Sequence, residues 1–166
     1  GNIQFYFIKS FNYYAHMFAY KKKYFLIIES IKDIDLKNIK KRNKFSIIYR
    51  NKNNLEKMSD LLNFRRFCRA KSIKFYVANN VKLALLLNSD GIYLSSFNKN
   101  LKSLLLIRPN FKLIGSAHNS KEIFLKIKQG CEEILFSKLF SVNYDKKAPF
   151  LGVVKFNNYL KINKNL

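Results

Sequence analysis

The chain has 166 residues, the length of one domain, and its 48% apolar content excludes an intrinsically disordered protein. A net charge of +22 would suit a nucleic-acid binder, but Lys outnumbers Arg 26 to 6 and the lysines are scattered. Nucleic-acid surfaces use Arg for bidentate contacts, and the abundant Lys, Asn, Ile, Phe and Tyr are residues with AT-rich codons. Composition therefore predicts no specific nucleic-acid partner.

Residues 1–23 differ from the rest of the chain. Five apolar residues have the spacing of one face of an amphipathic helix, and three lysines at 21–23 follow them: Ile3, Phe7, Phe11, Tyr14 and Phe18. Polar residues interrupt the segment too often for a membrane span, and it lacks the basic start of a signal peptide. We expect an N-terminal amphipathic extension that packs on the domain, with a membrane surface as the alternative.

From residue 24 to the end, short apolar runs alternate with amphipathic segments. The predicted strands are 24–28, 45–49, 73–77, 92–94, 111–114 and 133–136. The predicted helices are 36–39, 55–68, 81–87, 101–107, one that begins after Asn119 and Ser120, and 153–160. Two helices have a clear apolar side, formed by Leu61, Leu62, Phe64 and Phe67 in one and by Ile123, Phe124 and Ile127 in the other.

This order of elements predicts an α/β fold with a parallel sheet covered by helices. About six βα units over residues 24–166 favour a (β/α)8 TIM-barrel type that is incomplete, and an open doubly wound sheet is the alternative. No G-x-G-x-x-G or P-loop motif is present. Six strands cannot close an eight-stranded barrel, so we expect either a fragment or a homo-oligomer in which a second copy completes the sheet.

Polar residues follow each predicted strand, where the active face of such a barrel lies. They include Arg50 and Lys52, Asn79 and Asn80, Ser95 and Asn98, and Ser116 and His118. This set is basic and rich in neutral hydrogen-bonding groups, with almost no carboxylate. It predicts a phosphate-ester pocket and argues against a two-carboxylate hydrolase.

The two cysteines, Cys68 and Cys131, are far apart, without a C-x-x-C motif or a histidine at metal-ligand spacing. They predict reduced thiols in a cytoplasmic protein and no zinc site.

Several segments follow one another in the order of a known pattern: Arg50-Asn51-Lys52, Ala78-Asn79-Asn80-Val81-Lys82-Leu83-Ala84, Asp90-Gly91-Ile92-Tyr93-Leu94, Ile114-Gly115-Ser116-Ala117-His118, Gly130-Cys131-Glu132-Glu133 and Ala148-Pro149-Phe150-Leu151-Gly152. Together they resemble the thiamine phosphate synthase/TenI family of barrels. The resemblance implies coupling of a pyrimidine pyrophosphate to a thiazole phosphate with release of pyrophosphate, aided by Mg²⁺. Small phosphate esters are then the expected partners.

The resemblance also assigns roles to residues. Arg50, Lys52, Asn79 and Ser116 match positions that hold the pyrophosphate, and Lys146 corresponds, with a one-residue shift, to a basic catalytic residue. Asn79 and Asn98 stand where the family has two magnesium-binding aspartates. Because an amide brings no negative charge, these residues would hold Mg²⁺ weakly.

His118 leaves a second chemistry open. In the TenI branch of the family, a histidine in this region moves a proton on a thiazole phosphate carboxylate, which requires no magnesium. The alternatives are therefore an active synthase, a TenI-like tautomerase or catalytically degenerate phosphate-ligand binder, and a basic nucleic-acid or membrane-surface binding protein. A histidine that only contacts the start of the following helix is the structural alternative for His118.

Overall fold

The computed structural model describes residues 4–11, 22–38, 45–53, 56–101, 110–137 and 151–155. For residues 4–11, 22–24, 38, 136–137 and 151–155 it describes the backbone alone. In the described part of the chain no helix is long and apolar enough to cross a membrane.

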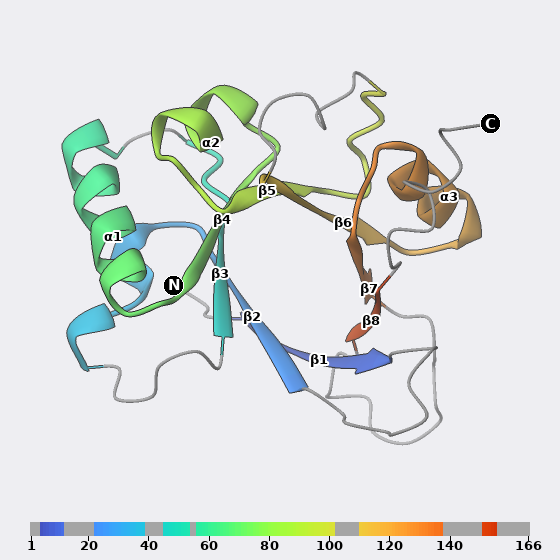
Figure 1. Cartoon of the computed structure of the whole chain (residues 1–166), viewed down its shortest axis with the longest axis horizontal. Helices are drawn as coiled ribbons and strands as arrows, with labels where there is room; N and C mark the ends of the chain where they lie inside the picture. The colour runs from blue at the N-terminus through green and yellow to red at the C-terminus, as the bar shows by residue number, and fades with distance from the viewer. Residues whose placement is uncertain are drawn as a thin grey trace.

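Six consecutive parallel strands form the main part of the sheet, each paired with the next in the chain (Figure 1). They are β2 (Lys22–Ile28), β3 (Phe45–Tyr49), β4 (Lys74–Ala78), β5 (Gly91–Leu94), β6 (Lys112–Ala117) and β7 (Glu133–Ser137). All six strands predicted from the sequence are present. The incomplete (β/α) barrel that they predicted is confirmed.

Two further strands, β1 (Gln4–Phe11) and β8 (Leu151–Lys155), close this sheet into a barrel. β1 runs antiparallel to β2 and parallel to β8, and β8 runs antiparallel to β7. Neither strand follows the (β/α) pattern, since each runs opposite to its parallel-sheet neighbour. The chain thus supplies its own strands at the two edges of the six-stranded sheet, for which we expected either a fragment or completion by a second copy.

These two strands correct two helix predictions. The amphipathic helix expected within 1–23 is wrong for Gln4–Phe11, and the helix expected at 153–160 is wrong for residues 153–155. Both segments are rich in aromatic or β-branched residues, which fit a pleated sheet, and both find an unpaired strand edge beside them. The remaining residues of both predicted helices, and the predicted helix at 101–107 beyond Leu101, lie outside the described residues.

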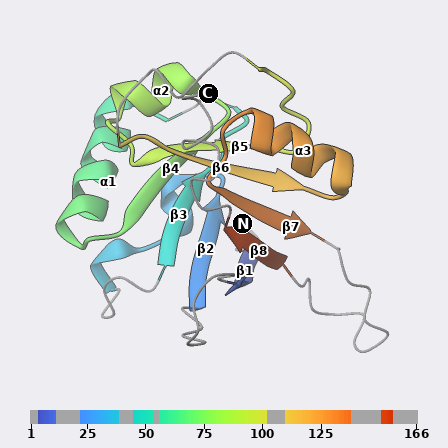
Figure 2. The same ribbon diagram turned by 45° about the vertical axis from the view of Figure 1, so that its right-hand side comes forward.

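The helices α1 (Met58–Ala70), α2 (Val81–Leu86) and α3 (Ser120–Lys128) cover the outside of the curved sheet (Figures 1 and 2). Two short 3₁₀ helices, η1 (Ile31–Asp33) and η2 (Leu36–Asn38), follow β2. The second of them is the short helix predicted at 36–39.

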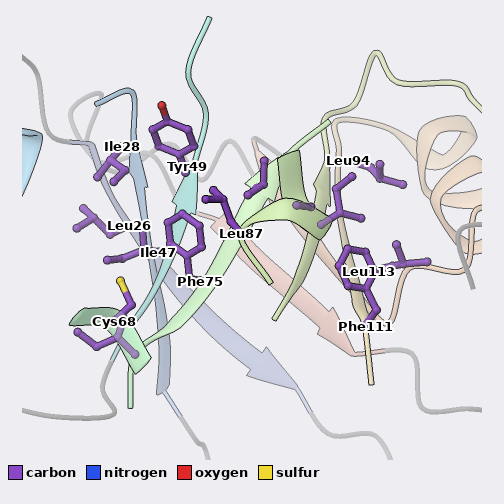
Figure 3. Close-up of a cluster of buried hydrophobic side chains, with 14 of the residues drawn as sticks. Leu26, Ile28, Ile47, Tyr49, Cys68, Phe75, Leu87, Leu94, Phe111 and Leu113 are labelled. Carbon is purple, nitrogen blue, oxygen red and sulfur yellow. The ribbon is translucent and has the colours of Figure 1, made fainter. Parts of the chain in front are cut away.

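The core has two layers because side chains alternate between the faces of a strand. One buried residue from each parallel strand meets the others inside the curve of the sheet: Phe25, Ile48, Tyr76, Tyr93, Ile114 and Leu135. The larger layer lies between sheet and helices, where Ile47 and Phe75 lie between Tyr49 and Cys68 of α1 (Figure 3). Residues two positions further along each strand share this inner face, so their side chains lie toward the carboxyl-end opening of the barrel.

The buried faces of two helices differ from the prediction. In α1, Phe67 is 45% exposed, and the buried residues are Leu61, Phe64, Arg65 and Cys68. In α3, Phe124 is 65% exposed while Lys126 is fully buried. Both observed faces keep the i, i+3, i+4 spacing of one helix side, so each misplaced phenylalanine lies one step around the helix from the core.

Both cysteines have free thiols and are buried. Burial raises the pKa of each thiol to about 12. Cys68 and Cys131 therefore act as small core residues in the native state.

Candidate functional site

A cleft of about 750 Å³ opens at the carboxyl ends of β3 and β4. The described residues that line it are Arg50, Asn51, Lys52, Ala78, Asn79, Asn80, Val81 and Phe97. They bring two cationic side chains, three amides and one aromatic ring, and no carboxylate. Arg50, Lys52 and Asn79 were predicted as pyrophosphate-binding residues, and the structure brings these three together.

The two cations of the cleft differ in their surroundings. Arg50 directly follows β3, and its backbone N–H donates to the carbonyl oxygen of Ile28 at 2.8 Å. Its guanidinium makes no hydrogen bond or ion pair with another described residue. Lys52 lies 3.8 Å from a carboxylate oxygen of Glu29, in a pair whose side chains are both about two-thirds exposed. Such an exposed pair is weak, so both cations are available to a ligand.

The loop that carries these cations is held by Glu56. Its Oε1 accepts hydrogen bonds from Ser30 Oγ at 2.6 Å and from the backbone N–H of Ile31 at 2.8 Å. Its Oε2 accepts from the Tyr49 hydroxyl and from Asn51 Nδ2. Burial by itself would raise the pKa of Glu56, but these hydrogen bonds lower it overall. The ionised carboxylate ties the loops after β2 and β3 into one support.

Asn79 occupies a strained position at the end of β4. Its φ of 58° lies in the left-handed region, which Asn tolerates better than most residues. Its backbone N–H donates to the Tyr93 carbonyl oxygen at 2.8 Å. Its Oδ1 accepts three hydrogen bonds, from Ser95 N at 3.0 Å, Ser95 Oγ at 3.1 Å and Asn98 Nδ2 at 3.1 Å.

Asn79 and Asn98, the two positions implied as metal ligands, are thus hydrogen-bonded to each other. The Asn79 oxygen already has three donors, and the Asn98 Oδ1 accepts from the backbone N–H of Asn100 at 3.1 Å. Among the described residues, no group of three or more His, Cys, Asp or Glu could hold a metal ion. Mg²⁺ prefers carboxylates and phosphates, so the described residues do not fit this ion.

A buried lysine supports the loop that carries Asn98. Lys126 of α3 donates to the Asn98 carbonyl oxygen at 2.7 Å and to Gln129 Oε1 at 2.8 Å. Gln129 Nε2 in turn donates to the carbonyl oxygens of Asn98 and Asn100. Burial lowers the pKa of Lys126. The loop after β5 is therefore fixed from behind by Lys126 of α3 and by Gln129, the residue that directly follows this helix.

His118 lies directly before α3, whose N-cap residue is Asn119, and contacts the first turn of that helix. Its backbone N–H and its Nδ1 both lie within hydrogen-bonding distance of Glu122 Oε2, at 2.6 and 3.0 Å. Asn119 Oδ1 accepts from the Glu122 backbone N–H at 3.0 Å. The arrangement resembles a capping box, in which side chains satisfy the free N–H groups at a helix start. The contact with the start of the following helix, which is the structural alternative for His118, is thus observed, and the catalytic role of His118 stays a prediction.

Two other predicted site residues lie elsewhere. Ser116 follows Ile114 by two residues in β6, so it shares the inner face, but it is not among the described residues that line the cleft. Lys146 lies outside the described residues.

Sequence reasoning missed Phe97 and Lys126. Phe97 is 68% exposed and lines the cleft beside the cations. Its place soon after a predicted strand could have identified it, whereas Lys126 lies on a helix rich in lysine and has no signal in the sequence.

Comparison with known proteins identifies a family that matches most of the chain. The model of the family described as thiamine monophosphate synthase matches residues 30–164. The thiamine-phosphate synthase of Prochlorococcus marinus subsp. pastoris is 26% identical over 110 residues, which cover 66% of this chain and 31% of that protein. The enzyme of the same name from Flavobacterium psychrophilum is 26% identical over 106 residues, or 61% of this chain and 52% of the relative.

A solved structure, thiamine phosphate pyrophosphorylase from Pyrococcus furiosus, aligns with a TM-score of 0.48 at 21% identity, covering 61% of this chain and 51% of that one. The chain spans about a third to a half of the length of the curated relatives that it matches. The family match itself extends over most of the chain, from η1 past β8. The chain belongs to the thiamine monophosphate synthase family.

Proposed function

We propose that the chain binds a pyrimidine pyrophosphate in the cleft at the carboxyl ends of β3 and β4. The observation that carries this proposal is the lining of the cleft, which has two cations, three amides and no carboxylate among its described residues. Membership of the thiamine monophosphate synthase family supports the choice of ligand.

Arg50 is the anchor that we assign to the pyrophosphate. A guanidinium presents several N–H donors in a plane and binds phosphate oxygens through two parallel hydrogen bonds. Because the Arg50 guanidinium has no hydrogen bond or ion pair with another described residue, a ligand displaces no internal partner. Lys52 adds a second charge, and its ion pair with Glu29 is exposed and long.

Phe97 suits the ring of the same ligand. An exposed aromatic side chain beside two cations offers a flat apolar face where a heteroaromatic ring can stack while its phosphates meet the charges. Coupling of the bound pyrimidine to a thiazole phosphate, which would form thiamine phosphate, is the reaction that family membership suggests.

The binding test uses inorganic pyrophosphate and isothermal titration calorimetry. We expect Arg50→Ala to weaken binding by roughly 10- to 100-fold, the value of a charged hydrogen-bonding pair. The matched control is Arg66→Ala, which removes the same charge from an exposed position whose side chain contacts Asn63 of its own helix. Equal affinity in wild type and Arg50→Ala would contradict the assignment.

The reaction test mixes pyrimidine pyrophosphate and thiazole phosphate with the protein and measures thiamine phosphate and released pyrophosphate. Product formation that depends on Arg50 supports a synthase. Binding without product supports a ligand-binding member of the family.

A second candidate is a tautomerase that acts on a thiazole phosphate carboxylate. The observation that favours it is the contact between His118 Nδ1 and Glu122, because a carboxylate can orient an imidazole for proton transfer. Loss of tautomer exchange in His118→Ala, with the fold retained, is the expected result.

A further inference from the structure

The loops after β4 and β5 are joined at the cleft by side-chain amides. Asn79 Oδ1 accepts from Asn98 Nδ2 and from both donors of Ser95. A carbonyl oxygen has two lone pairs, so three donors saturate it. The Asn79 oxygen therefore has no free lone pair to offer a cation. Its position is fixed by these hydrogen bonds and needs no metal ion.

The opposite end of the bridge is also hydrogen-bonded, although its side-chain oxygen accepts from one donor rather than three. Asn98 Oδ1 accepts from Asn100, while the Asn98 backbone N–H donates to the Ser95 carbonyl oxygen at 3.0 Å. Behind the loop, the Lys126 ammonium bonds directly to the Asn98 carbonyl oxygen and is fully buried. A dication at the half-buried Asn98 side chain would lie close to this positive charge, and the two charges would repel each other.

The cleft itself provides cations where a metal site needs anions. Arg50 and Lys52 line it, and no described lining residue is a carboxylate. Protein sites hold Mg²⁺ through one or two carboxylates together with the phosphates of the substrate. Arg50 and Lys52 can neutralise the negative charge of the phosphates directly, as a bound metal ion would otherwise do.

We propose that this cleft binds its phosphate ligand without a divalent cation, and that the Asn79–Asn98 hydrogen bond replaces a metal bridge between the loops after β4 and β5. The inference rests on the proposed phosphate site. It departs from the magnesium dependence that the family resemblance implies, because the described residues do not fit that ion.

The test compares pyrophosphate binding to the wild-type chain in excess EDTA and in excess magnesium chloride, corrected for the magnesium–pyrophosphate complex in solution. We expect the two dissociation constants to agree within about threefold. Binding that is about tenfold tighter or more with magnesium would overturn the inference and leave the phosphate site intact. Absence of binding in both buffers would overturn the phosphate site and the inference together.

A matched pair of variants examines the amide bridge. Asn98→Asp replaces the donor that faces Asn79 with a carboxylate, and we expect pyrophosphate binding to gain a magnesium dependence of about tenfold. Asn80→Asp adds the same charge to the same cleft outside the bridge, where Asp caps the helix as well as Asn does. This control should gain none. Equal behaviour of the two variants would remove the bridge from the explanation and overturn the proposal.

Discussion

Lys126 and Asn98 lie 28 residues apart in the chain and are joined by a hydrogen bond of 2.7 Å from ammonium to carbonyl oxygen. The lysine is fully buried, although lysine is rarely buried without a partner. Gln129 completes the contact, since it accepts from Lys126 and donates to the same carbonyl oxygen. Helix α3 thereby determines where the Asn98 side chain meets Asn79.

Replacing this lysine should change how stability depends on pH. Burial lowers the pKa of Lys126 in the folded state, so over the alkaline range below its ordinary value of 10.5 the unfolded chain binds more protons than the native one. Stability from this group therefore rises as pH increases through that range. Urea unfolding across this range should show that the unfolding free energy of wild type rises with pH relative to that of Lys126→Met.

The control for this measurement is Lys128→Met, on the same helix but with an exposed side chain. It should leave the pH dependence of the unfolding free energy unchanged. If both variants follow the same pH curve, the burial of Lys126 does not affect its protonation. Amide hydrogen exchange provides a second readout, because residues 98–100 should exchange faster in Lys126→Met alone.

The parallel strands could be predicted because each is a short apolar run bounded by polar residues, as in Ile92-Tyr93-Leu94. β1 and β8 could not. Their residues permit either a helix or a strand, and the choice depends on pairing with strand edges distant in sequence: Ile8 of β1 pairs with Leu151 of β8. Helix faces were predicted only approximately, since the expected core residue Phe124 is exposed in α3 while Lys126, which lies almost opposite it on the helix, is buried.

The site, too, was predicted from the sequence only in part. The position of polar residues after strands was enough to predict that Arg50, Lys52 and Asn79 belong to one cleft. The hydrogen bond between Asn79 and Asn98 could not be predicted, because it joins residues 19 positions apart on different loops and depends on side-chain orientation. That these two residues do not fit a metal ion therefore became clear only from their hydrogen bonds in the structure.

The exposed ring of Phe97 should contribute to the binding of ligands that carry a ring, and not to the binding of ligands without one. We expect Phe97→Ala to weaken pyrimidine pyrophosphate binding by about 0.5–1.5 kcal/mol, the usual value of an aromatic pair. Inorganic pyrophosphate has no ring and should bind unchanged. Calorimetry with both ligands separates the effects, and Phe124→Ala, an equally exposed phenylalanine of α3, is the control. A parallel loss for both ligands would contradict the stacking role.

The cap formed by Glu122 should weaken in acid. Its pKa is lowered, chiefly by the hydrogen bond from the His118 backbone N–H. Because the folded pKa lies below the ordinary 4.5, the contribution to stability is present above that value and is lost as pH falls through the folded pKa. Glu122→Gln should therefore cost stability near neutral pH and little in acid, with a loss of at most about 1 kcal/mol at this solvent-exposed cap.

Chemical unfolding of wild type and Glu122→Gln at neutral and acidic pH measures this difference. Glu132→Gln, which removes one charge from an exposed side chain on the same surface segment after α3, is the control and should show no such pH dependence. A loss from Glu122→Gln that is equal at both pH values would mean that the charge of Glu122 does not stabilise the cap.

Two glycines should differ in their tolerance of a methyl group. At Gly91, the first residue of β5, an added Cβ would lie 1.9 Å from the backbone carbonyl oxygen of Lys112 in β6. At Gly115, it would lie 2.7 Å from Cδ of Lys126 and 2.9 Å from Sγ of Cys131. Side chains can move by a few tenths of an ångström, whereas a paired strand backbone cannot move without disturbing the ladder.

We expect Gly91→Ala to destabilise the fold by about 3 kcal/mol, the upper part of the range for overpacking, and Gly115→Ala by about 1–2 kcal/mol. Urea unfolding measures both. The difference has a functional side, since β5 leads into the Ser95–Asn98 loop, and separation of β5 from β6 should displace that loop from Asn79. Gly91→Ala should therefore also weaken pyrophosphate binding, whereas an unchanged affinity in a folded Gly91→Ala protein would show that the loop position does not depend on strand pairing at β5.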